Sequence, residues 1–251
     1  MQILKYLLLA CTLVFTSVNA AELFTVAIAA NLKYVFDDLA AEFKKETGIE
    51  VQSIVNASGK IATQVRQGAP FDVFMSADME FPEGLYKEGY AVTAPKPYAY
   101  GVLVLWSQTG ADLSKGVAGL ANKTVGNVAI ANPKLAPFGK QSVKSMEYYK
   151  VKAALEPKLV YGESITQVSQ FVESKAVDVG FSAKSIVIAP ETAGKGKWVA
   201  VPEESYEPIA QGIVILKHGI DAHADSARKF YEFVQSEKAR AIFAKNGYKL
   251  P

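Results

Sequence analysis

The chain has 251 residues, half of them hydrophobic, and a formal net charge of +2 at pH 7. Such a balanced charge excludes the basic surface that binds nucleic acid or acidic lipid. With one cysteine in the whole chain, a disulfide-built scaffold is also excluded, so the fold must be held together by a buried core.

The N-terminus has the pattern of a secretory signal peptide. Lys5 precedes an apolar run, Tyr6–Phe15, and small residues follow up to Ala20. We expect removal of residues 1–20 and a nearly neutral, periplasmic mature protein. The alternative is a lipoprotein anchored at Cys11, although the apolar run before that cysteine is short.

The segment Phe24–Phe43 predicts a strand, a short turn and a helix. Its first five residues form a continuous apolar run, as in a strand buried on both faces. Apolar residues then recur three and four positions apart from Leu32 onwards, which indicates an amphipathic helix. Asn31 lies at the turn, where it can cap the helix or contribute to an anion site at the helix N-terminus.

The same alternation continues along the chain. Strands are predicted at Ile49–Val55, Phe71–Met75, Tyr98–Trp106, Val125–Ala131, Leu159–Tyr161, Val177–Ser182 and Ile209–Leu216. Helices are predicted at Ile61–Val65, Met79–Gly89, Ser164–Ser174, Ala222–Ser236 and Lys238–Lys245. A further helix is predicted after the turn at residues 132–139 and ends at Tyr149.

This order predicts an α/β protein of two lobes, each a mainly parallel sheet flanked by helices. Residues 21–98 and 207–251 are expected to form the first lobe and residues 99–206 the second. The chain would cross near Pro97 and return near Pro208. Ligands of such sheets bind beyond the carboxyl ends of the strands, so the predicted site is the cleft between the lobes.

Four segments resemble the periplasmic molybdate-binding proteins of ABC importers. They are IAANL at 28–32, NASGKIATQVRQGAPFDVFMSAD at 56–78, ANPKLAPFGK at 131–140 and NGY at 246–248. The resemblance covers essentially the whole mature chain. It implies a type II solute-binding fold that closes on molybdate or tungstate and delivers it, as a monomer, to a permease in the inner membrane.

The resemblance also implies the site residues. These are Asn31 with the Ala30 amide, the Ser58 hydroxyl and amide, and the backbone N–H groups of Phe138 and Ile165. Some members add a tyrosine where this chain has Ala183, so one hydroxyl donor is missing. No cofactor and no directly coordinated cation is implied, because molybdenum or tungsten is bound as the oxyanion.

These positions suit a doubly charged tetrahedral anion, since they offer hydrogen-bond donors without formal charge. Hydrogen phosphate would leave its proton without an acceptor, at a cost of about 1–3 kcal/mol. Glu163, close in sequence to Ile165, would weaken this argument if it accepted that proton. Sulfate or thiosulfate remains the alternative ligand.

Other features predict no chemistry. Tyr148 and Tyr149 resemble an iron-binding pair but suit a helix surface, and Asp37–Asp38 suits a solvated helix face. His218 and His223, five residues apart, lack metal-ligand spacing and are expected to be solvated or to cap a helix. An enzyme is not expected, since the mature chain has no cysteine, no dinucleotide glycine motif and no base near a serine.

Overall fold

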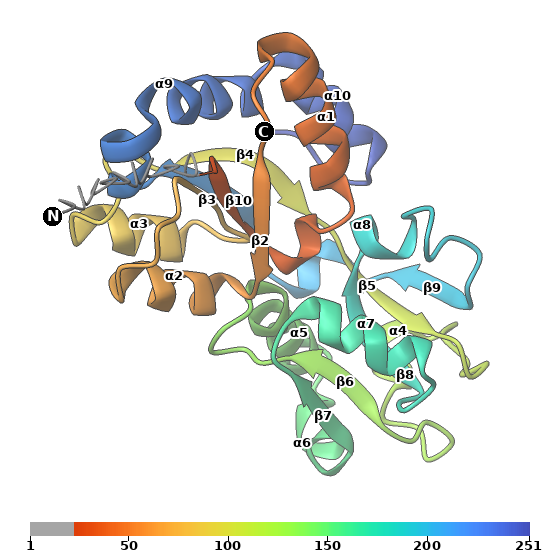
Figure 1. The fold of residues 1–251 in the computed structure, drawn as a ribbon. Helices are drawn as coiled ribbons and strands as arrows, with labels where there is room; N and C mark the ends of the chain where they lie inside the picture. Colours follow the sequence, from red (N-terminus) through yellow and green to blue (C-terminus); the bar gives the residue numbers. More distant parts are fainter. Residues whose placement is uncertain (1–22) are drawn as a thin grey trace, which may run out of the picture.

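The structure is a computed structural model that describes residues 23–251. The predicted signal peptide and Cys11 lie outside the described residues. Within residues 23–251 the chain forms two lobes, each built on one five-stranded sheet (Figure 1). No helix in this range is long and apolar enough to cross a membrane.

The first sheet has the strand order β2-β1-β3-β10-β4. Its strands are β1 (Thr25–Ala29), β2 (Gln52–Asn56), β3 (Val73–Met75), β4 (Lys96–Gly101) and β10 (Ile209–Ile215). Helices cover both faces (Figure 1): α1 (Val35–Thr47), α9 (Lys217–Val234) and α10 (Glu237–Lys245) on one, α2 (Ser58–Arg66) and α3 (Glu80–Lys87) on the other. A three-residue 3₁₀ turn, η1 (Ala30–Leu32), follows β1.

The second sheet has the order β7-β6-β8-β5-β9. Its strands are β5 (Leu103–Ser107), β6 (Val128–Ala131), β7 (Leu159–Gly162), β8 (Val179–Ala183) and β9 (Lys197–Ala200). The longer helices are α5 (Pro137–Tyr148) and α7 (Ile165–Glu173), which pack on β6 and β8. Shorter elements are α4 (Gly116–Gly119), α6 (Lys152–Leu155), α8 (Lys184–Val187), η2 (Glu156–Lys158) and η3 (Glu203–Ser205).

The two-lobe prediction is confirmed, but the sheets are mixed rather than mainly parallel. Strands β1, β2 and β3 pair in parallel, as do β6, β7 and β8, whereas every pairing of β5 and of β10 is antiparallel. The reason is the double crossing. Each of β5 and β10 enters its sheet from the other lobe, so it starts at the edge where the parallel strands end.

The first crossing lies at Val102, between β4 and β5, and not at Pro97. The predicted boundary after residue 98 therefore falls inside β4, which belongs to the first sheet. The second crossing lies between β9 and β10, a stretch that contains the predicted boundary at 206/207.

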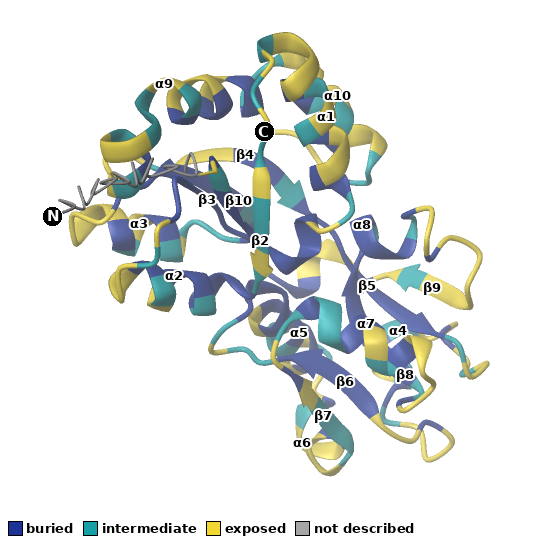
Figure 2. Ribbon diagram, in the orientation of Figure 1, coloured by how far each residue is buried: buried dark blue, intermediate teal, exposed yellow. Residues whose placement is uncertain are grey.

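Both lobes have buried cores: the central strands are buried, the edge strand β2 is partly exposed and the edge strand β9 is largely exposed (Figure 2). The core of the second lobe continues across the cleft, because it forms one cluster with Ala29, Ala30, Ala57 and Ala77 of the first. The lobes are thus in direct contact at the carboxyl ends of β1, β2 and β3.

Candidate functional site

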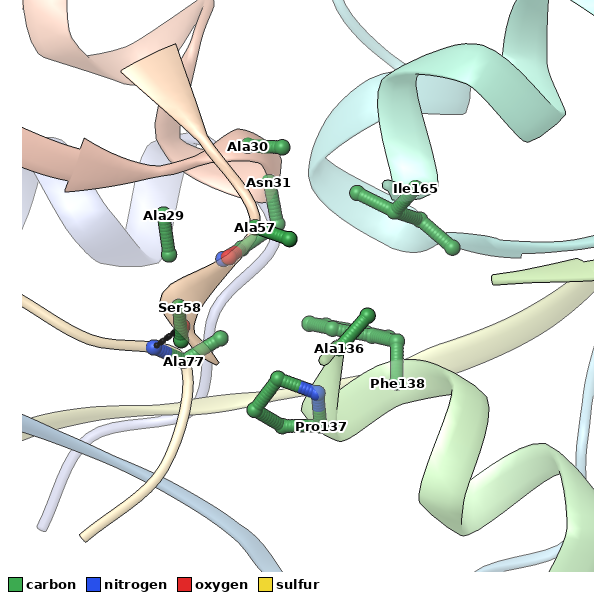
Figure 3. Close-up of a pocket in the computed structure, with 10 residues that line it drawn as sticks. All are labelled: Ala29, Ala30, Asn31, Ala57, Ser58, Ala77, Ala136, Pro137, Phe138 and Ile165. Atoms are coloured by element: carbon green, nitrogen blue, oxygen red, sulfur yellow. Dashed lines mark hydrogen bonds between the residues drawn. The ribbon is translucent and has the colours of Figure 1, made fainter. Parts of the chain in front are cut away.

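The five residues predicted to contact an anion line one pocket between the lobes (Figure 3). Ala30, Asn31 and Ser58 approach from the first lobe, and Phe138 and Ile165 from the second. The rest of the lining is small or apolar: Ala29, Ala57, Ala77, Ala136 and Pro137. Their role as ligand contacts remains a prediction.

Three helices begin at this pocket. Ser58 is the first residue of α2, Ile165 is the first of α7, and Phe138 is the second of α5. The N–H groups in the first turn of a helix have no carbonyl partner within that helix, and the helix dipole makes this end positive. The pocket thus collects backbone donors from both lobes, which favours an anion.

Ser58 adds a hydroxyl donor. Its Oγ accepts a hydrogen bond of 3.0 Å from the backbone N–H of Ala77, so its own hydrogen remains for another acceptor. The side chain is almost fully buried, so that acceptor must come from inside the pocket.

Asn31 has a different local role from the cap that the sequence allowed. It lies inside η1, while α1 begins at Val35 with Tyr34 as its N-cap residue. Its Nδ2 donates to Gln211 Oε1 and to the Tyr248 hydroxyl, both at 3.0 Å. Its Oδ1 is buried and has no hydrogen-bond partner. As placed, the amide therefore uses both hydrogens away from the pocket, contrary to the predicted NH₂ donor.

Two buried tyrosines complete the polar group around Asn31. The Tyr98 hydroxyl lies 2.9 Å from both Gln211 Oε1 and Ser76 O, and the Tyr248 hydroxyl donates to Asn31 O at 2.8 Å. Burial raises the pKa of both hydroxyls, so both stay protonated near neutral pH. Sequence reasoning missed this group, although Gln211 stands out as a polar residue in an apolar strand.

None of the described residues that line the pocket carries a formal charge. Glu163 lies outside the lining and forms an ion pair of 2.5 Å with Lys60 of the first lobe. Its carboxylate is therefore not an acceptor within the pocket. Ala183, at the position where the resemblance implies a tyrosine in some members, ends β8 and is not part of the lining either.

Further contacts hold the lobes together around the pocket. The Gly59 N–H donates to Leu135 O at 2.9 Å, the Thr166 hydroxyl to Ala30 O at 3.2 Å, and the Ser185 hydroxyl to Asn31 O at 3.0 Å. The arrangement is that of a closed cleft.

The two histidines behave differently from the sequence expectation. Instead of being solvated or capping a helix, both lie within hydrogen-bond distance of the buried Asp72. The distance from the ring Nδ1 to Asp72 Oδ1 is 2.8 Å for His218 and 3.0 Å for His223. The backbone N–H of Thr25 donates to the other oxygen of Asp72 at 2.6 Å. No local pattern in the sequence indicates this cluster, because Asp72 lies about 150 residues before the histidines. As predicted, Asp37 and Asp38 are exposed.

Comparison with known proteins identifies the family. Residues 24–249 match the model of the bacterial extracellular solute-binding proteins. The chain belongs to this family. That membership confirms the prediction of a solute-binding protein rather than an enzyme.

Individual relatives of this solute-binding protein carry more specific names. It is 41% identical to the molybdate-binding protein ModA of Rhodobacter capsulatus, over 88% of this chain and 86% of the relative. It is 37% identical to ModA of Azotobacter vinelandii, over 97% and 94% of the two chains.

Solved structures agree with the two-lobe fold. The periplasmic molybdate-binding protein of Azotobacter vinelandii superimposes with a TM-score of 0.83 at 33% identity, covering 92% of this chain and all of the other. The sulfate-binding protein SubI of Mycobacterium tuberculosis H37Rv, with a TM-score of 0.76 at 17% identity, shows only that the fold is shared.

Proposed function

We propose that this protein captures molybdate or tungstate in the cleft between its lobes and delivers it to an ABC importer. The observation that carries the proposal is the convergence of three helix starts and the Ser58 hydroxyl on a pocket without charged side chains. The names of the relatives at 37% and 41% identity support the choice of anion.

The donor set explains how an uncharged pocket holds a dianion. Each hydrogen bond to a charged acceptor contributes roughly 1.5–3 kcal/mol. About six of them, less the costs of ordering and closure, reach about 8–12 kcal/mol, which is micromolar to nanomolar affinity.

The same donor set separates anions by their protons. Molybdate, tungstate and sulfate carry none at neutral pH, whereas hydrogen phosphate carries one and needs an acceptor. Because Glu163 is outside the lining and paired with Lys60, it does not offer that acceptor. Sulfate is smaller than the oxometalates, so its rejection depends on pocket size.

We also propose a periplasmic protein that acts as a monomer and meets a permease in the inner membrane. The family membership and the signal-peptide pattern of residues 1–20 support export. The two-crossing architecture supports an opening and closing cycle, in which closure completes the donor set from both lobes.

The test is thermal denaturation and titration calorimetry of the mature protein with molybdate, tungstate, sulfate and phosphate. A ligand that binds only the folded state raises the melting temperature, so molybdate and tungstate should raise it at micromolar concentration and phosphate should not. A shift with sulfate alone would transfer the assignment to sulfate. No shift with either oxometalate at millimolar concentration would refute the proposal.

A further inference from the structure

The polar group around Asn31 contains two buried atoms without a hydrogen-bond partner. One is Asn31 Oδ1 and the other is Gln211 Nε2. In the same group, the single hydrogen of the Tyr98 hydroxyl faces two acceptors, Gln211 Oε1 and Ser76 O. A buried donor or acceptor left unpaired is costly, so this group has a defect at a place that lines the pocket.

Rotating both carboxamides by 180° keeps the hydrogen bond between them and places a donor instead of an acceptor at the pocket. The oxygen and nitrogen of a carboxamide have nearly the same size, so only their hydrogen bonds decide which way round they lie. After rotation, Gln211 Nε2 donates to Asn31 Oδ1 and to the Tyr98 oxygen, and Tyr98 donates to Ser76 O. The Tyr248 hydroxyl donates to Asn31 Oδ1, while Ser185 still donates to Asn31 O. The two atoms then without a partner are Gln211 Oε1 and Asn31 Nδ2, and an oxyanion in the pocket can accept from Asn31 Nδ2.

The two amides can turn only together. Turning Gln211 alone would set its NH₂ group against the NH₂ group of Asn31, which lies 3.0 Å away. Turning Asn31 alone would set two carbonyl oxygens against each other. Whether Gln211 presents its oxygen or its NH₂ group to Asn31 therefore decides which atom Asn31 presents on its other side.

We infer that Gln211 is a positioning residue that holds the Asn31 carboxamide with its NH₂ group toward the pocket. Asn31 then supplies a donor to the bound oxyanion, in keeping with the backbone amides and the Ser58 hydroxyl. This inference rests on the proposed function, and it assigns to a residue outside the pocket lining the control of donor against acceptor at Asn31. In Figure 3 the Asn31 amide extends from η1 toward the start of α2, where Ala57 and Ser58 lie.

A double-mutant cycle tests the inference by calorimetry with molybdate. Asn31→Ala should raise the Kd about 5- to 150-fold, because a donor to a charged acceptor is lost. Gln211→Met keeps the side-chain length but donates nothing, so Asn31 is free to turn and the Kd should rise by about tenfold. In the Asn31→Ala background, Gln211→Met should leave the Kd unchanged.

The cycle separates positioning from packing. If Gln211→Met raises the Kd equally in both backgrounds, Gln211 acts through the fold and the inference is wrong. If Gln211→Met in the otherwise unchanged protein leaves the Kd unchanged, the inference is also wrong.

Nuclear magnetic resonance of the unmodified protein gives a second test of the inference, which can be carried out even if Gln211→Met does not fold. With the side-chain amides labelled, the Gln211 NH₂ hydrogens should show Overhauser contacts to the Tyr98 ring, and the Asn31 NH₂ signals should shift on adding molybdate. Contacts from the Asn31 NH₂ hydrogens to the Tyr248 ring, with no shift on ligand, would overturn the inference. If molybdate and tungstate both fail to bind, the proposed function fails, while the contacts in the free protein still decide the amide orientation.

Discussion

Gly59 allows the two lobes to meet, and Gly59→Ala is the substitution that should prevent it. A Cβ at this position would lie 2.9 Å from Cζ of Phe81, 3.0 Å from Cα of Leu135 and 3.1 Å from Leu135 O. The tip of the Phe81 ring can move, but the Leu135 backbone belongs to the other lobe and can retreat only if the cleft opens. Gly59 also donates its N–H to Leu135 O at 2.9 Å.

The expected loss follows from these two contacts. Crowding a packed interface costs about 1–3 kcal/mol, and one hydrogen bond contributes about 0.5–1.5 kcal/mol. The closed state should thus lose about 2 kcal/mol or more, which raises the Kd for molybdate at least about 30-fold. The ligand-free protein should not be destabilised, because alanine is the better residue within a helix.

The assay is calorimetry together with stopped-flow dissociation and ligand-free melting. Gly84→Ala is the matched control, since Gly84 lies in α3 and a Cβ there meets only flexible side-chain ends, at 3.4 Å (Arg66) and 3.7 Å (Glu88). We expect a faster dissociation rate for Gly59→Ala and wild-type behaviour for Gly84→Ala. An unchanged Kd for Gly59→Ala would refute the reasoning that the closed cleft is the binding state.

Three further predictions concern the pocket and its surroundings. Ser58→Ala should weaken molybdate binding by about 1–3 kcal/mol in calorimetry, because a buried hydroxyl donor is lost, whereas the exposed Ser174→Ala should bind like the wild type. Ile165→Pro should weaken binding more than Ile165→Ala, because proline fits the first position of α7 but removes the N–H; equal affinities would show that this N–H does not touch the ligand. Burial raises the pKa of Asp78 from 3.8 to about 6, so the folded state holds the proton more tightly and stability should fall by about 1–3 kcal/mol as the pH rises from 4 to 7. Chemical denaturation across this range should show the fall in the wild type and a flatter profile in Asp78→Asn, and identical profiles would contradict it.

Most helices and strands could be predicted from the sequence, because the hydrophobic pattern of each has the period of a helix or a strand and stops at turn residues. The first crossing could not, since Tyr98–Trp106 forms one unbroken apolar run in which β4 ends and β5 begins in different lobes. The edge strand β9 was missed because its four residues are largely exposed and follow a basic loop. Mixed sheets follow from the two crossings, whose existence was predicted, so the antiparallel direction of β5 and β10 could have been inferred from them.

The candidate site was predictable in its positions but not in its chemistry. Helix starts and a serine can be found in a sequence, and the structure brings Ser58, Phe138 and Ile165 into one pocket. What Asn31 offers to a ligand depends on Gln211, 180 residues away, and on two tyrosine hydroxyls. Hydrogen-bond partners so distant in the chain leave no local pattern.

The uncharged lining of the pocket governs how binding responds to the medium. Because the dianion brings no proton or cation with it, the loaded protein carries two more negative charges than the empty one. Attraction between opposite charges fades as ionic strength rises, whereas short hydrogen bonds inside a closed cleft are hardly screened. Uptake of the anion should therefore proceed almost equally well in dilute and in salty surroundings, and loaded molecules should elute later than empty ones from an anion exchanger.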